Sequence, residues 1–239
     1  RAGDASNSRM ARQWLKVASD QGSARAAFQL GCMADGDAET AEWFELSAAR
    51  GFAKAQCGLA ELLLQRTGDD DRGRRPTFRD DCRAVELLES SAAQGYAQAQ
   101  FVLGKLLYPK EKRKGQAVSK LETARTTSMT GGLVPSELAA IHYFKLAANQ
   151  DHIAAQRELG SIYARQTNMS TARHRPVLSS GSGSVGGLRA QRPFARSSES
   201  QKTRTQHLAL HYWKRAAELG DAEAQFNLAR ALMGAALLA

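Results

Sequence analysis

The chain repeats one sequence pattern five times, and this repetition constrains its fold more than any other feature. Each copy contains a turn residue, used below as the anchor of the repeat, and a leucine eight positions after it. The residue after that leucine is always Gly or Ala. The anchors are Gly22, Gly51, Gly95, Asp151 and Gly220. Internal repetition of this kind predicts an array of stacked supersecondary units.

The residues around each anchor predict a helical hairpin. Bulky apolar pairs stand eight and seven positions before the anchors: Trp14-Leu15, Trp43-Phe44, Leu87-Leu88, Tyr143-Phe144 and Tyr212-Trp213. An alanine usually stands eleven positions before the anchor, on the same helical stripe. A Gly anchor accepts the left-handed backbone that ends a helix, and a second helix then buries the leucine. We expect Leu103 and Leu159 to be buried, and the small residue after each leucine to bring the two helices of one hairpin together.

These features predict the fold class. We expect an all-α fold, an α-α superhelix (solenoid) of about five degenerate helical-hairpin repeats with loop insertions. Prolines are absent from the repeat helices, as helix interiors require.

The pattern resembles the Sel1-like repeat, a relative of the tetratricopeptide repeat. The resemblance is carried by an aromatic pair followed by Ala-Ala-x-x-Gly-x-Ala-x-Ala-Gln-x-x-Leu-Gly. The second copy matches at Trp43-Phe44, Gly51, Ala53, Ala55, Gln56 and Leu59, and the fifth at Tyr212-Trp213, Gly220, Ala222, Ala224, Gln225 and Leu228. The family's tyrosine three residues after Leu-Gly is kept as Tyr163 and replaced elsewhere, so the repeats are degenerate. The resemblance implies an adaptor or scaffold that binds proteins, and no chemistry.

Three stretches lengthen the spacing between repeats. Residues 67–81 are rich in charge and turn formers, and residues 109–136 are basic and then broken by Gly and Pro. Residues 168–206 are mostly Ser, Gly and Arg, a composition that buries too little apolar surface to offset ordering. We therefore expect the third insertion to be disordered. Residues 1–239 are expected to form a single solenoid and, because Arg1 is no initiator Met, to be a fragment of a longer chain.

The charge distribution separates two hypotheses of function. The net charge is +9, but the basic excess lies in residues 109–125 and 165–206, and the rest of the chain is slightly acidic. Positions three, seven and ten after the anchors should face a partner from the second helices. The candidate partner-binding residues are Arg25, Gln29, Lys54, Glu61, Gln98, Lys105, Glu158, Asn227 and Arg230. They mix cations with anions, whereas a phosphate track needs one sign of charge.

The first hypothesis is thus a non-catalytic protein–protein interaction scaffold, part of a larger complex, that grips an extended segment or a helix. The alternative is an RNA-associated helical-repeat protein whose basic loops contact phosphates. A third hypothesis is the regulatory domain of an enzyme whose catalytic part lies outside this sequence.

No catalytic, cofactor-binding or metal site is predicted, and we expect the chain not to be an enzyme. Cys32, Cys57 and Cys82 contain no Cys-x-x-Cys pair, and this low, odd count weakly favours a reducing intracellular compartment without assigning a location. His207 and His211 share one helical face, but the segment lacks the Glu of a metalloprotease motif.

The C-terminal segment is apolar, and we expect a neighbour to cover it. Leu232, Met233, Leu237 and Leu238 have no following helix, so further chain or another subunit is expected to cover them. No apolar run reaches the length of about 18 residues that a membrane span requires.

Overall fold

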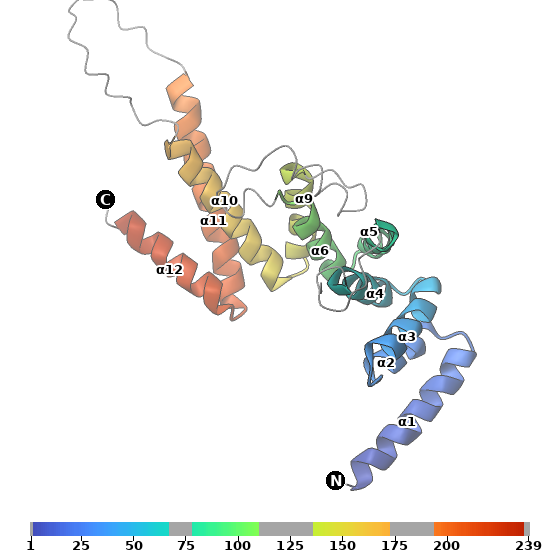
Figure 1. Cartoon of the computed structure of the whole chain (residues 1–239). Helices are drawn as coiled ribbons and strands as arrows, with labels where there is room; N and C mark the ends of the chain where they lie inside the picture. The colour runs from blue at the N-terminus through green and yellow to red at the C-terminus, as the bar shows by residue number, and fades with distance from the viewer. Residues whose placement is uncertain (1, 67–77, 110–135, 173–193, 237–239) are drawn as a thin grey trace, which may run out of the picture. The chain divides into compact units, whose positions relative to one another are not determined.

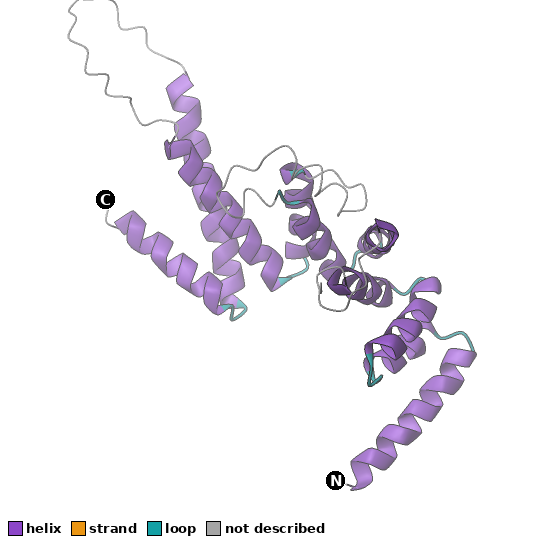
Figure 2. Cartoon of the chain, viewed as in Figure 1, coloured by secondary structure: helices purple, strands orange, loops and turns teal. Residues whose placement is uncertain are grey.

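The computed structural model describes residues 2–66, 78–109, 136–172 and 194–236, and all regular structure in these ranges is helical (Figure 2). The helices are α1 (Ala2–Asp20), α2 (Ala24–Cys32), α3 (Asp37–Ala49), α4 (Ala53–Arg66), α5 (Phe78–Ala93), α6 (Ala97–Leu107), α9 (Glu137–Ala148), α10 (Ile153–Ala172), α11 (Phe194–Glu218) and α12 (Ala222–Ala236). Each repeat has a first helix before its anchor (α1, α3, α5, α9 and α11) and a second helix after it. The predicted all-α solenoid of degenerate helical-hairpin repeats is confirmed.

The anchors end the first helices as the sequence predicts. All four glycine anchors have a positive φ between 81° and 95°, and Asp151 has a φ of 59°. In the glycine-anchored turns the next residue donates its backbone N–H to the carbonyl five residues back, as in Phe52 to Ser47 at 3.2 Å. This is the pattern of a Schellman motif, which satisfies carbonyls at the end of a helix.

The residue after the anchor begins the second helix, in three repeats with a side-chain cap. The Ser23 hydroxyl, the His152 Nδ1 and the Asp221 carboxylate each accept a backbone N–H from the residue three positions on, at 3.2, 3.3 and 2.8 Å. Such caps satisfy donors that a helix N-terminus leaves without an intrahelical partner.

The chain divides into two compact units, residues 1–150 and 151–239, and the division falls in the fourth anchor turn. In the first unit every helix packs on its neighbour in chain order, from α1 and α2 through to α6 and α9 (Figure 1). In the second unit α10 packs on α11, and α11 on α12. Contacts between successive helices are what a solenoid produces. That residues 1–239 form a single solenoid stays a prediction.

Two insertions are shorter than their composition suggests. Residues 78–81 already belong to α5, and the third insertion is helical at both ends, in α10 up to Ala172 and in α11 from Phe194. The expectation that the whole of 168–206 lacks structure is wrong at these ends. Packing overrides composition there, since Thr167 on α10 and Thr205 on α11 form a hydroxyl–hydroxyl hydrogen bond of 2.9 Å. Residues 173–193 lie outside the described residues, and the prediction of disorder stays untested for them.

The second insertion begins and ends at one place. Ser136 donates its backbone N–H to the Leu107 carbonyl at 2.9 Å, and its hydroxyl accepts from Ala139 N at 3.4 Å to cap α9. The exit from α6 and the entry to α9 are therefore tied together by a backbone hydrogen bond.

Candidate partner-binding surface

The contact between successive repeats is built on a glycine and an aromatic ring. A Cβ added to Gly31 would lie 2.6 Å from Cδ1 of Phe44, and one added to Gly104 would lie 2.6 Å from Cδ1 of Phe144. A Cβ on Gly160 would likewise meet the indole ring of Trp213. In each pair the glycine is on a second helix and the ring is on the first helix of the next repeat.

This arrangement corrects the expectation that the small residue serves its own hairpin. The ring seven positions before an anchor lies between two second helices, that of its own repeat and that of the preceding one. Phe44 shows both contacts, because a Cβ on Gly58 of its own repeat would lie 2.8 Å from its Cε2. The small residue after the leucine therefore joins one repeat to the next. Leu103 and Leu159 are fully buried, as predicted.

The second and third repeats use a different pair at the same two positions. Ala60 replaces the glycine and Leu88 replaces the ring, and both side chains are fully buried in one apolar cluster. The extra methyl group of alanine thus coincides with a smaller side chain opposite. We call the residue after the leucine the socket and the residue seven positions before an anchor the knob.

A polar ladder runs beside the sockets of the first unit. Gln94 Nε2 donates to Gln56 Oε1 at 2.8 Å, and Gln150 Nε2 donates to Gln100 Oε1 at 2.9 Å. Gln56 and Gln100 are themselves buried and donate to carbonyls of their own first helices, at 3.4 and 3.2 Å. Each ladder bond joins the residue before one anchor to the residue five positions after the preceding anchor.

Other side chains replace the ladder where these glutamines are missing. Ala27 stands at the glutamine position of the first repeat, and Arg50 instead donates to the Ser19 carbonyl at 3.0 Å. In the second unit Arg215 pairs with Asp151 at 2.8 Å, and Arg157 contacts Asp221 at 3.2 Å. Sequence reasoning missed these polar links, although the recurrence of Gln before two anchors and after the preceding ones was a visible signal.

The candidate partner-binding residues, hereafter the partner row, are all accessible to solvent. Arg25, Gln29, Lys54, Lys105 and Arg230 are exposed, and Glu61, Gln98, Glu158 and Asn227 are partly exposed. Of the pairs within the row, Gln98 Nε2 on α6 donates to Glu61 Oε1 on α4 at 2.7 Å. Two second helices of the first unit therefore present their row residues side by side.

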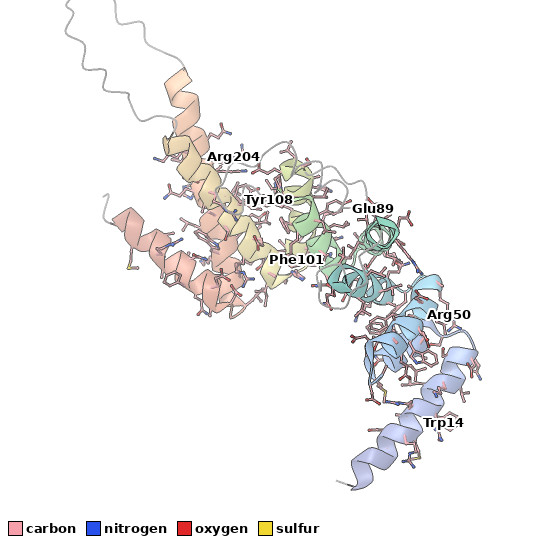
Figure 3. The ribbon with its side chains drawn as sticks, in the orientation of Figure 1. Trp14, Arg50, Glu89, Phe101, Tyr108 and Arg204 are labelled. Carbon is pink, nitrogen blue, oxygen red and sulfur yellow. The ribbon has the colours of Figure 1, made fainter. Side chains whose placement is uncertain are left out.

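Aromatic rings support two cations of the partner row. The Lys105 ammonium lies 5.6 Å from the centroid of the Phe101 ring, which is labelled on α6 in Figure 3. In the second unit the Arg230 guanidinium lies 5.8 Å from the Phe226 centroid, and its Nη2 is 3.4 Å from the Asn227 side-chain oxygen. Cation–π contacts of this type are weak at exposed sites, and they orient the charged group over the ring.

The row differs in charge between the two units. In the first unit it carries the cations Arg25, Lys54 and Lys105 against the single anion Glu61. In the second unit Glu158 stands against Arg230. The row in the first unit is therefore basic, although the chain outside the insertions is not.

The described residues offer little reactive chemistry. Burial, and after it the Glu61 carboxylate, raises the pKa of the Cys57 thiol to about 12, and burial also raises the pKa of Cys32. Both shifts disfavour the thiolate, which is the nucleophilic form of cysteine. Within the described ranges no three His, Cys, Asp or Glu side chains gather as metal ligands, and His207 and His211 are exposed on α11. No helix in those ranges is long and apolar enough to span a membrane.

Known proteins provide the comparison. A family model described as the Sel1 repeat matches residues 3–23, 53–96, 128–152, 204–221 and 222–236, together more than half of the chain. No curated protein matches significantly.

Two solved structures are similar over most of the chain. A protective antigen of uropathogenic Escherichia coli strains, described as displaying an SLR fold, is 23% identical with a TM-score of 0.45, and the match covers 94% of this chain and 44% of that one. A Sel1 repeat protein from Oxalobacter formigenes is 16% identical with a TM-score of 0.46, covering 92% and 58%. The chain thus spans about half the length of these proteins.

Proposed function

The chain belongs to the Sel1 repeat family, and we propose on this basis that it is a scaffold or adaptor whose partner row binds another protein within a larger complex. Sel1 repeats generally mediate protein–protein interactions, and proteins of the family are generally non-catalytic scaffolds. The proposal concerns which surface is used and what kind of partner fits it.

The observation that carries the proposal is the Gln98–Glu61 hydrogen bond between α6 and α4. It holds together row residues from two successive repeats, so a partner lying across the second helices would meet both at once. A solenoid presents extended surfaces of this kind to its ligands. The row residues are polar and exposed, whereas the knobs and sockets of the first unit are buried between helices.

The charge of the row favours an acidic partner segment. Lys54 and Lys105 are exposed, and Glu61 already accepts a hydrogen bond from Gln98. Carboxylates of an extended segment or a helix would be attracted to the two lysines. Complementary charges of this type act mainly on specificity and on the rate of association.

The test uses two pairs of lysines on the first unit. The variant Lys54→Glu with Lys105→Glu reverses the charge of the row, and the control Lys16→Glu with Lys145→Glu makes the same change at exposed sites on the first helices α1 and α9. A photo-crosslinker at Gln29 should capture one defined polypeptide with the parent chain and the control, and lose it with the row variant. Equal capture by both variants would refute the partner row.

A nuclease arm separates this proposal from RNA association. Capture of the polypeptide should survive nuclease treatment if the row binds protein directly. Capture that disappears with nuclease, together with a steep fall in affinity as salt rises, would favour RNA-mediated association instead.

A further inference from the structure

The two terminal helices keep opposite halves of the repeat-to-repeat contact. On α1, Ala11 is exposed and Leu15, the first knob, is only half-buried. The residues at the Ala11 position in the other described repeats that have alanine, Ala84, Ala140 and Ala209, are at most 3% exposed, and the later knobs at most 9%. The N-terminal helix therefore presents a knob face without a socket from the described residues.

At the other end, α12 presents a socket. Ala229 is exposed, whereas the equivalent Ala60 is fully buried beside Leu88. Gln225 is also exposed, whereas the equivalent Gln56 and Gln100 are 6% and 4% exposed. Phe226 is 65% exposed.

The residue before each socket by three positions shows what Phe226 would do. In two repeats a phenylalanine at this position lies against the incoming knob, with ring centroids 5.2 Å apart for Phe28 and Phe44 and 5.8 Å apart for Phe101 and Phe144. Phe226 is thus one wall of a socket whose floor is Ala229.

The two ends match each other residue by residue. The socket Ala229 and the knob Leu15 are the same pair of residue types as Ala60 and Leu88. Gln225 and Gln21 are the same pair as Gln56 and Gln94, which form a ladder bond of 2.8 Å. Gln21 is exposed and stands directly before its anchor, where Gln94 stands in the third repeat.

From this correspondence we propose that two copies of the chain associate head to tail, with α1 of one molecule seated on α12 of another. The interface repeats the contact between α4 and α5 inside the chain, with Leu15 in the Ala229 socket and Gln21 bonded to Gln225. Trp14, which is 73% exposed on α1, adds aromatic surface at the edge of the contact (Figure 3). Because this interface joins two different surfaces, each added copy leaves one knob face and one socket free, and assembly continues beyond a dimer unless a ring closes.

The experiment blocks the two faces separately. Ala11→Glu introduces a charge on the knob face, and Ala229→Glu introduces the same charge in the socket. Both alanines are exposed within one molecule, so each variant should fold and keep the helical circular dichroism of the parent. Ala38→Glu, at another exposed alanine on α3, is the matched control.

Sedimentation velocity and light scattering then give the assembly state. The parent and the Ala38→Glu control should show an average mass that rises with concentration above the 25.9 kDa of one chain. Each blocked variant alone should remain monomeric. An equimolar mixture of the two blocked variants should form a dimer and stop there, because one retains a working socket and the other a working knob.

Three results would overturn the proposal. The first is a parent chain that stays monomeric at every concentration. The second is a mixture of blocked variants that remains monomeric while the parent associates. The third is association lost with Ala229→Glu and kept with Ala11→Glu, which would indicate a symmetric contact between two α12 helices. Capture of a protein partner by the row variants is measured separately, so failure here leaves the proposed function standing.

Discussion

Replacing Gly104 by Ala tests the knob-and-socket contact with the smallest possible change. The substitution adds one methyl group on α6, where it would lie 2.6 Å from both Cδ1 and Cε1 of Phe144. Carbon atoms prefer a separation of about 3.5–4.0 Å, so the ring would have to move by roughly 1 Å. Phe144 is fully buried and has no solvent-facing side toward which it can move freely.

Two opposing effects set the size of the result. Alanine is favoured over glycine in a helix interior by about 1 kcal/mol. Overpacking a well-filled site by a methyl group costs about 1–3 kcal/mol. We expect Gly104→Ala to be neutral or destabilising by up to about 2 kcal/mol, instead of stabilising by the propensity alone.

The decisive comparison adds Phe144→Leu, which makes the pair resemble Ala60 and Leu88. In that background the methyl group has room, and Gly104→Ala should stabilise the protein by about 1 kcal/mol. The coupling energy of the double-mutant cycle is then about 1–3 kcal/mol, within the range measured for residues in contact. Amide hydrogen exchange of α6 and α9 gives the local free energies, because an array of repeats need not unfold in a single step.

A single outcome would refute this reasoning. If Gly104→Ala stabilised α6 by the same amount in the parent and in the Phe144→Leu background, the coupling energy would be zero. The ring would then not occupy the socket, and the contact between repeats would have to lie elsewhere.

Three further predictions concern single side chains. Gln100→Leu removes the ladder acceptor of Gln150 and should lower the free energy of unfolding by about 1–3 kcal/mol in urea titrations, and an unchanged urea midpoint would argue against the ladder. Burial lowers the pKa of His152 from 6.5, so the unfolded chain binds more protons and stability should fall as the pH drops below 6.5. His152→Asn keeps a side-chain acceptor at this helix start and should remove that component from thermal melts, whereas an identical pH dependence would assign it to another group. Cys57 should resist iodoacetamide in the folded protein at neutral pH while the exposed Cys32 reacts, and equal labelling by mass spectrometry would contradict the buried position of Cys57.

The fold was predictable because the repeat pattern combines two independent signals. The anchor requires a left-handed backbone, which glycine supplies at four positions and Asp151 at the fifth. The leucine and the bulky pair then place apolar surface on both sides of each anchor. Together these signals specify helix, turn and helix without any knowledge of tertiary contacts.

The partner of each socket was not predictable in the same way. Helical periodicity identifies which face of a helix is apolar, but not which of two neighbouring helices that face meets. Phe44 contacts positions on both neighbours, Gly31 and Gly58, so no single spacing assigns it. The polar ends of α10 and α11 were missed for a related reason, because their Thr167–Thr205 contact depends on two helices lying together and not on the composition of either.

The candidate surface was predicted only in outline. Offsets from the anchor identified exposed positions on the second helices, and the exposure of Arg25, Lys54 and Lys105 agrees with this. The bond between Gln98 and Glu61 depends on the separation of α4 and α6 in space, which anchor spacing does not give because an insertion intervenes. Whether a partner uses this row stays a prediction.

The backbone hydrogen bond from Ser136 to Leu107 frees the length of the sequence between them from the geometry of the array. Since both ends of that stretch are held at one point, adding residues changes only the entropy of closing a loop, which grows slowly with loop length. The junction between α6 and α9 is therefore a natural acceptor site for inserted sequence. A reporter domain or an affinity tag placed there should leave the packing of Gly104 against Phe144 intact, which makes this junction the position of choice for engineering the chain.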